Sequence, residues 1–354
     1  MNVPKLRFKE FNDEYGKLKY KDVLKIKSGK DQKQVEDENG KYPILGTGGQ
    51  IGKTNSFLYD KPSVLIGRKG TINKPQYMES PFWTVDTLFY SHIYEPNIPK
   101  YLFYSFQNVN WKKYDESTGV PSLSSSTIES VECSIPSPNE QIKVANFLSL
   151  LDKKIELQTK KIEDLKLFTK KLETQYIFNS NNEYNKKRID EIFNVKAGGD
   201  LNKNNISFIK TPLFCYPIYS NNLEMNGLYG YSDIYKIGEE SITVTGRGDI
   251  GKAIKREGKY YPIVRLLVLI PKISVNLIYM QEAINNLKLI QESTGVPQLT
   301  APQISKYKVS YPTLDIQNEY GDILLLLQEK IKYEISKAEK LQQLKKGLMQ
   351  SMFV

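Results

Sequence analysis

The chain has 354 residues, of which 40% are hydrophobic and 25% charged, and it carries a formal net charge of +10. This composition excludes a disordered chain, and the longest apolar run, Ile323–Leu327, is too short to span a bilayer. Two cysteines give no disulfide framework, and the N-terminus shows no apolar signal segment, so we expect a cytoplasmic protein without a membrane partner. The positive charge favours a polyanionic partner.

The first globular segment is predicted to span residues 1–138 and to mix strands with helix. Short runs rich in β-formers, Ser63–Ile66 and Trp83–Tyr90, are bounded by turn residues, and a helix is expected near Lys100–Trp111. Its polar and basic glycine loops contain the candidate DNA contacts Gln50, Arg68, Lys69, Gly70 and Lys74.

A long helix over 139–180 follows this segment. Its apolar residues alternate in steps of four and three, which is the spacing of a coiled-coil seam. The seam consists of Val144, Leu148, Leu151, Ile155, Gln158, Ile162, Leu165, Thr169, Leu172 and Tyr176. About 40 residues make a rod of roughly 60 Å, and a single helix cannot bury its own apolar stripe.

The second globular segment is predicted to span residues 181–314 and has the same mixed character. Ser241–Thr245 and Ile263–Ile270 are expected to be strands, and Leu277–Ile290 a helix. The matching loops contain the candidate DNA contacts Asn221, Asn222, Arg247, Gly248, Lys252 and Arg256. Glycine allows a loop to approach DNA closely, while arginine can hold phosphate or read guanine, so recurrence of these loops favours DNA contact over solvated turns.

The last segment, 315–354, is predicted to be a second long helix with its own seam. That seam consists of Tyr320, Leu324, Leu327, Ile331, Glu334, Ala338, Leu341, Lys345, Leu348 and Met352. We expect the two helices to form an antiparallel coiled coil with pseudo-twofold symmetry, in which the polar seam positions fix the register. Apolar residues off the seam are expected to bind partner helices: Leu157, Leu167, Phe168, Ile323, Leu325, Ile335 and Leu344.

An internal repeat relates the two halves. The six residues Glu116–Pro121 return unchanged as Glu292–Pro297, and the match continues without a gap to the ends of both helices. Weaker matches upstream keep the same order, so the chain is a tandem duplication. Because each copy mixes predicted strands with helices, we expect the fold class to be α+β. The globular segments have diverged more than the helices.

Catalytic motifs are incomplete. Gly48–Thr54 and Gly246–Lys252 imitate phosphate-binding loops. The first is preceded by Thr47 where the pattern needs a glycine, and the second is followed by Ala253 where the pattern needs a hydroxyl residue to hold magnesium. One histidine in the whole chain argues against histidine-rich metal sites and histidine-based triads. The sequence therefore favours recognition over catalysis.

These features together resemble the specificity subunit (HsdS) of Type I restriction–modification systems. The resemblance rests on the repeated Thr-Gly-Val-Pro loop, the lead-ins Pro136–Gln141 and Pro312–Gln317, the paired heptad helices, and the motif Ile66–Gly70. It implies two target-recognition domains that read a split, asymmetric site in double-stranded DNA. It also implies two methylation subunits and restriction subunits as partners, with S-adenosylmethionine, ATP and Mg on those partners and no cofactor in this chain. The second half departs from the pattern at Tyr260–Pro262.

Two other classes remain open at the level of sequence. One is a stand-alone DNA-binding regulator, although the seam helices are longer than a regulator's linker. The other is a coiled-coil scaffold, although the paired basic loops argue for a nucleic-acid partner.

Overall fold

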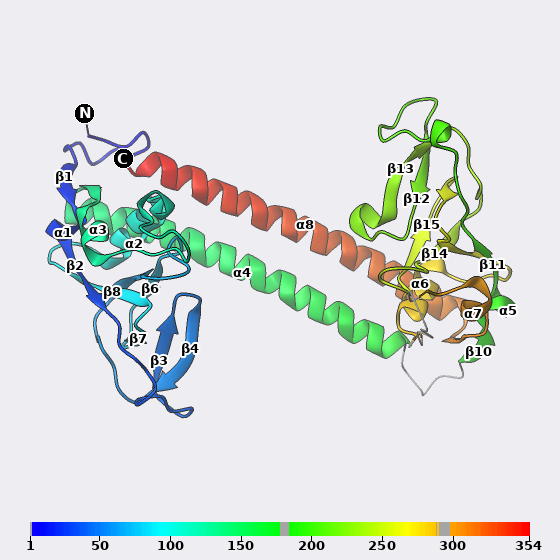
Figure 1. Ribbon diagram of the computed structural model, residues 1–354, viewed down its shortest axis with the longest axis horizontal. Coiled ribbons are helices and arrows are strands. Elements are labelled where there is room, and N and C mark those ends of the chain that lie inside the picture. Colours follow the sequence, from blue (N-terminus) through cyan, green and yellow to red (C-terminus); the bar gives the residue numbers. More distant parts are fainter. Residues whose placement is uncertain (1, 178–183, 288, 290–297) are drawn as a thin grey trace. The chain divides into compact units, whose positions relative to one another are not determined.

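The computed structural model describes residues 2–177, 184–287, 289 and 298–354 (Figure 1). The second copy of the repeated loop, Glu292–Pro297, lies outside the described residues, as do positions 178–180 of the first predicted helix. The chain divides into two compact units, Met1–Lys160 with Ile335–Val354, and Lys161–Glu334. Each unit therefore contains a globular part and segments of both long helices.

The same elements occur in the same order in the two halves of the sequence, which confirms the tandem α+β duplication. The first copy consists of β1 (Gly16–Lys19), α1 (Tyr20–Val23), β2 (Leu24–Ser28), β3 (Tyr42–Gly46), β4 (Gly49–Thr54), β5 (Ser63–Gly67), β6 (Gln76–Met78), β7 (Trp83–Thr84), β8 (Leu88–Ile93), α2 (Pro99–Asn108), α3 (Ser125–Ser130), β9 (Glu132–Ile135) and α4 (Pro138–Ile177). The second copy consists of β10 (Asn185–Arg188), α5 (Ile189–Ile192), β11 (Phe193–Ala197), β12 (Tyr216–Tyr219), β13 (Leu228–Ser232), β14 (Ser241–Val244), β15 (Ala253–Arg256), β16 (Tyr261–Pro262), β17 (Leu267–Pro271), α6 (Leu277–Asn285), α7 (Ala301–Ser305), β18 (Lys308–Tyr311) and α8 (Leu314–Met352).

Each globular part contains three small sheets. The first has the orders β2-β8-β5-β6, β4-β3-β7 and β1-β9, and the second has β11-β17-β14-β15, β13-β12-β16 and β10-β18. The two lists match strand for strand. Because the short strands alternate between sheets, the loops at their ends are brought together from distant parts of the sequence.

The two longest predicted strands are each broken at the same place. The run Trp83–Tyr90 divides into β7 and β8, and Ile263–Ile270 is a strand only from Leu267. The break arises because the chain changes sheets there: β7 pairs with β3 in parallel, whereas β8 pairs with β2 and β5. Residues rich in β-formers continue on both sides of the break, so the pattern of β-formers does not show where the chain changes sheets.

The repeated Pro-x-x-x-x-Gln lead-in has a structural explanation. The buried Gln141 side chain donates to Pro136 O at 3.0 Å and accepts from Ile98 N at 2.8 Å. In the second copy Gln317 donates to Pro312 O at 2.9 Å and accepts from Asn276 N at 3.0 Å. This glutamine ties the start of each long helix to the residue that precedes α2 or α6.

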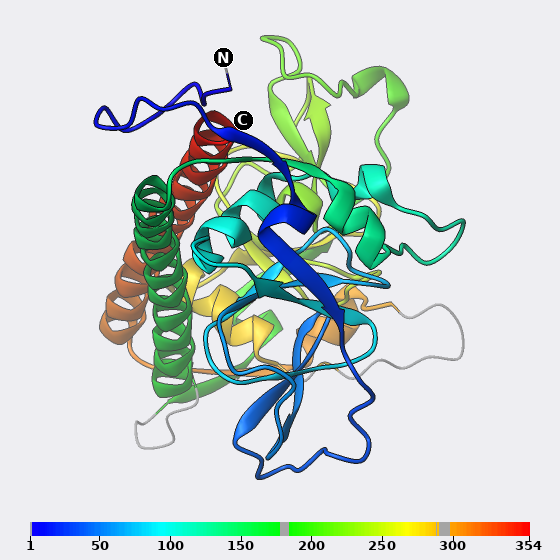
Figure 2. The ribbon, with the colours of Figure 1, turned by 90° about the vertical axis from the view of Figure 1, so that its left-hand side faces the viewer.

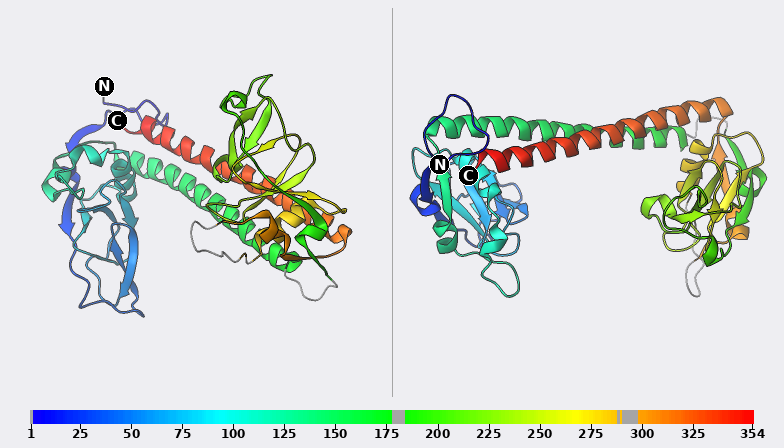
Figure 3. Two further views of the ribbon diagram at one scale, coloured as in Figure 1. Left: turned by 45° about the vertical axis from the view of Figure 1, so that its right-hand side comes forward. Right: turned by 90° about the horizontal axis from the view of Figure 1, so that it is seen from above.

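The long helices pair in antiparallel fashion within each unit, and Figure 3 shows them side by side. In the first unit Lys345 forms an ion pair with Asp152 at 2.6 Å. In the second unit Tyr176 packs on Tyr320 with 5.4 Å between ring centroids. Every predicted seam residue is buried or half-buried, which confirms the heptad assignment.

One polar seam residue is almost fully buried. The Glu334 side chain is 1% exposed and its carboxylate lies 2.6 Å from Lys161 Nζ and 3.4 Å from Lys330 Nζ. A buried acid that requires nearby cations disfavours other registers of the seam.

The first unit also uses the end of α8. Met352 and Phe353 lie in its core, where Phe353 stacks on Tyr101 at 5.2 Å, and Leu6 N donates to Ser351 O at 2.8 Å. Figure 2 shows the N-terminal segment passing this end of α8. Among the helices of the described residues, none is long and apolar enough to cross a membrane.

Candidate nucleic-acid interface

The first basic loop follows β5 directly and is held by its backbone. Arg68 N donates to Thr87 O at 2.8 Å, and Gly70 N donates to Pro121 O at 2.8 Å. Gly70 has a φ of +87°, which glycine adopts without strain. The side chains of Arg68 and Lys69 are exposed, so the loop presents two cations from a fixed backbone.

The other candidates of the first unit are also exposed but occupy different surroundings. Gln50 lies on β4 and donates to Gly52 O at 3.2 Å. Lys74 lines a groove of about 830 Å³ together with Gln107 and Lys346, and the Arg68 loop does not line that groove.

Three loops of the second unit are joined by one side chain, that of Asn221. Its amide nitrogen donates to Val264 O at 2.7 Å, and its amide oxygen accepts from Gly246 N at 2.8 Å. Asn221 thus connects the loop after β12 to the loop after β14 and to the turn before β17. Both of its amide atoms are used inside the chain, so it positions the loops. Asn222 is exposed beside it.

This arrangement brings Arg247 together with an arginine that sequence reasoning missed, Arg265. Both line a cavity of about 190 Å³, together with Leu267 and Leu299. Val264 and Arg265 have φ values of +52° and +59°, an uncommon conformation that is strained for a β-branched valine. Arg265 is exposed, and the strained turn fixes its position at the surface. Only the break in the apolar run could have indicated this turn, since neither residue is a usual left-handed residue.

Gly248 and Lys252 complete the loop after β14. Gly248 has a φ of +68°, and Thr245 and Lys252 close the loop by a backbone hydrogen bond of 3.0 Å. The Lys252 side chain is exposed.

The structure argues against the expected DNA contact by Arg256. The residue is 5% exposed, and its guanidinium lies 3.7 Å from the centroid of the Tyr219 ring. Arg256 Nε donates to Thr243 Oγ1 at 2.9 Å, and Nη2 donates to Asn226 O at 2.7 Å. Burial lowers the pKa of this guanidinium from its usual value. Asn226 has a φ of +57°, so the hydrogen bond from the buried Arg256 to Asn226 O stabilises a left-handed turn.

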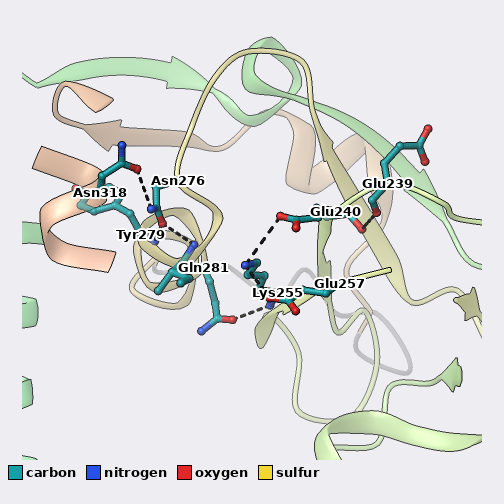
Figure 4. A network of polar contacts seen from close by, with 10 residues as sticks. Glu239, Glu240, Lys255, Glu257, Asn276, Tyr279, Gln281 and Asn318 are labelled. Atoms are coloured by element: carbon teal, nitrogen blue, oxygen red, sulfur yellow. Dashed lines mark hydrogen bonds and ion pairs between the residues drawn. The ribbon is translucent and has the colours of Figure 1, made fainter. Parts of the chain in front are cut away.

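The strand that carries Arg256 is anchored by polar contacts to α6 (Figure 4). Lys255 N donates to Gln281 Oε1 at 2.6 Å, and Lys255 Nζ lies 2.9 Å from Glu257 Oε1 and 3.9 Å from Glu240 Oε2. The charge of Lys255 is therefore balanced by two carboxylates. These contacts fix the edge strand β15 and with it one end of the Arg247 loop.

Most of the expected partner-binding residues are exposed on the long helices. Leu157 is 59% and Ile335 is 36% exposed in the first unit, where Leu344 is also exposed. In the second unit Leu167, Phe168 and Leu325 are exposed, whereas Ile323 is half-buried. Sequence reasoning missed Leu150 and Leu326, which are exposed on the same helices.

The described ranges contain no cluster of three or more His, Cys, Asp or Glu residues placed to hold a metal ion. The side chains brought together at the loops are cations and amides, which suit the recognition of phosphates and base edges.

Comparison with known families agrees with this geometry. The family model of the Type I restriction modification DNA specificity domain matches residues 12–167 and 181–346. The chain belongs to this family and is a specificity subunit of the Type I restriction–modification class. This confirms the expected class, a DNA-specificity component without catalysis, over a stand-alone regulator or scaffold.

Individual relatives carry the same designation. A putative type I specificity subunit of Mycoplasma pneumoniae is 25% identical over 318 residues, covering 86% of this chain and 87% of that protein. The specificity subunit of the Escherichia coli restriction enzyme EcoDI is 24% identical over 148 residues, covering 41% of this chain and 32% of that protein. The crystal structure of a Type I system S subunit from M. genitalium matches with a TM-score of 0.72 at 18% identity, over 99% of both chains. That likeness confirms the fold.

Proposed function

We propose that residues 1–138 and 181–314 are two target-recognition domains, each of which contacts one half of a split, asymmetric site in double-stranded DNA. The observation that carries this proposal is the repetition of one loop arrangement with different side chains. Arg68 and Lys69 follow β5 in the first copy, and Arg247 follows the equivalent β14 in the second. Equivalent loops with unlike side chains suit two half-sites of unlike sequence.

The side chains assigned to DNA contact are the exposed or half-exposed ones at these loops. In the first domain they are Gln50, Arg68, Lys69 and Gly70, with Lys74 at the neighbouring groove. In the second domain they are Asn222, Arg247, Gly248, Lys252 and Arg265.

The long helices, 139–180 and 315–354, are assigned as spacer and assembly surface. Their exposed apolar residues would be covered by helices of two methylation subunits, and restriction subunits would join that complex. S-adenosylmethionine, ATP and Mg would then be bound by those partners.

Separate replacement of Arg68 and Arg247 by alanine tests the domain assignment. Loss of an arginine that reads a base weakens binding by about 1–3 kcal/mol and relaxes preference at one position, so each variant should change only its own half-site. Methylated sites would be mapped genome-wide in cells that contain each variant with its methylation subunits. Normal methylation at the normal sites in both variants would refute these loops as readers.

A further inference from the structure

The loop Ser117–Pro121 has a sequence that the fold does not require. A Cβ added at Gly119 would meet no atom within 4 Å, and Gly119 does not have a left-handed φ. Val120 is 67% exposed, and Thr118 and Gly119 are exposed too. The same residues nevertheless return unchanged in the second half, within Glu292–Pro297, although the globular segment that precedes them has diverged. The packing of the first copy does not explain the repetition, whereas a molecule that contacts both domains would.

Side-chain hydrogen bonds hold the base of the loop, which separates it from an ordinary solvated turn. Asp115 Oδ1 accepts from Ser117 N at 3.0 Å and from Ser122 N at 2.9 Å, and Glu116 Oε1 accepts from Ser124 Oγ at 2.9 Å. The N–H groups of Ser122 and Ser117 hold the pKa of Asp115 below its usual value. In the part of the chain that the structure describes, the backbone N–H groups of residues 118–120 have no hydrogen-bond partner.

The loop lies directly against the first basic loop. Pro121 O accepts from Gly70 N at 2.8 Å, Leu123 N donates to Arg68 O at 2.9 Å, and Ser122 forms a β-bridge with Lys69. A ligand held by Arg68 and Lys69 therefore lies beside the loop where it returns to the domain at Pro121–Leu123. The free N–H groups, the Thr118 hydroxyl and a glycine without steric neighbours suit close approach to an anionic backbone.

We propose that Ser117–Pro121 binds the sugar–phosphate backbone of DNA and contributes affinity without reading the base sequence. This inference rests on the proposed function, because it takes the Arg68 loop to face DNA. The two half-sites differ in their bases but share the same backbone chemistry. A contact to the backbone can therefore keep one sequence in both domains while the base-reading residues diverge.

The test compares Gly119→Val with the unmodified chain, each in complex with the methylation subunits. The added Cβ meets no atom within 4 Å and the position is exposed, so the thermal midpoint should be unchanged, while the side chain should hold DNA off the loop. We expect affinity to fall about tenfold for target and for random duplexes alike, with the same methylated sequences. Thr118→Ala removes the hydroxyl and one methyl group and should lower the affinity about fivefold. This second variant tests the proposal even if Gly119→Val lowers the thermal midpoint.

Gly16→Val, at an exposed position of β1 with only ordinary contacts for a Cβ, is the matched control and should bind DNA normally. Unchanged affinity of the loop variants would overturn the inference, and so would a changed recognition sequence, which would make the loop a base reader. Loss of complex assembly with the methylation subunits would also overturn it and would assign the loop to a protein interface. An unmodified complex that binds no target DNA would instead reject the proposed function.

Discussion

At the scale of residues, burial separates two arginines that the sequence presents alike. Arg256 is enclosed between Tyr219, Thr243 and Asn226, whereas Arg265 stands exposed on a strained turn. The first stabilises the shape of the domain and the second is available to DNA.

Arg256→Ala is therefore expected to destabilise the second unit. Removal of the buried guanidinium leaves a cavity beside Tyr219 and takes away the donor to the Asn226 carbonyl, which should lower the free energy of unfolding by about 2–4 kcal/mol. Thermal or denaturant unfolding measures this loss. Lys252→Ala, at an exposed position of the same hairpin, serves as the control and should change stability by less than about 0.5 kcal/mol. An Arg256→Ala chain as stable as that control would show that the contacts are not structural.

Arg265→Ala is expected to have the opposite profile, with stability retained and recognition altered. The substitution should weaken binding by about 1–3 kcal/mol and relax preference only within the half-site that Arg247→Ala affects, because both side chains line one cavity. Sequencing of methylated sites reads this out. Relaxation in the other half-site would contradict the grouping of Arg265 with Arg247.

At the scale of elements, each long helix has a buried seam and an outer face on which apolar side chains stay exposed. The seam is closed by the antiparallel partner within each unit, and Glu334 with its lysines disfavours other registers. Leu157 and Ile335 lie outside the seam and remain exposed. An exposed apolar face on a long helix indicates a protein partner.

The double variant Leu157→Glu with Ile335→Glu is expected to weaken binding of the methylation subunits. Burial of either carboxylate in a helical interface is costly, so co-purification should fall at least tenfold while the globular parts stay folded. Lys153→Glu with Lys337→Glu, at exposed positions of the same two helices, controls for the added negative charge. If the Leu157→Glu, Ile335→Glu variant co-purified as well as the unmodified chain, these helix faces would not be the binding surface for the methylation subunits.

At the scale of the whole molecule, the duplication gives one architecture two independent sets of loops. Arg68 belongs to the first compact unit and Arg247 to the second. Sites without shared partners contribute additively to free energy.

The double variant Arg68→Ala with Arg247→Ala should therefore lose the sum of the two single losses in binding free energy, within about 0.5 kcal/mol. Titration of the complex with target DNA, for both single variants and the double variant, closes this thermodynamic cycle. A strongly non-additive result would mean that recognition in one domain depends on the other.

The sequence by itself determined the features that depend on local pattern. The heptad seam and the tandem repeat are periodic, so they are visible without tertiary contacts, and the structure confirms both. Glycine and arginine also mark the loops that follow β5 and β14 in the sequence, and their contact with DNA stays a prediction.

Only the tertiary structure decided which loop residues face outward and which loops meet. Arg256 is buried by Tyr219 and Asn226, which lie at least 30 residues away in the chain, so no local signal could show its burial. Asn221 joins loops through contacts with Gly246 and Val264, and Arg265 is placed by a change of sheet within the run Ile263–Ile270. Pattern in a sequence reports which face of an element is apolar, whereas the convergence of loops depends on how the strands are ordered in the sheets.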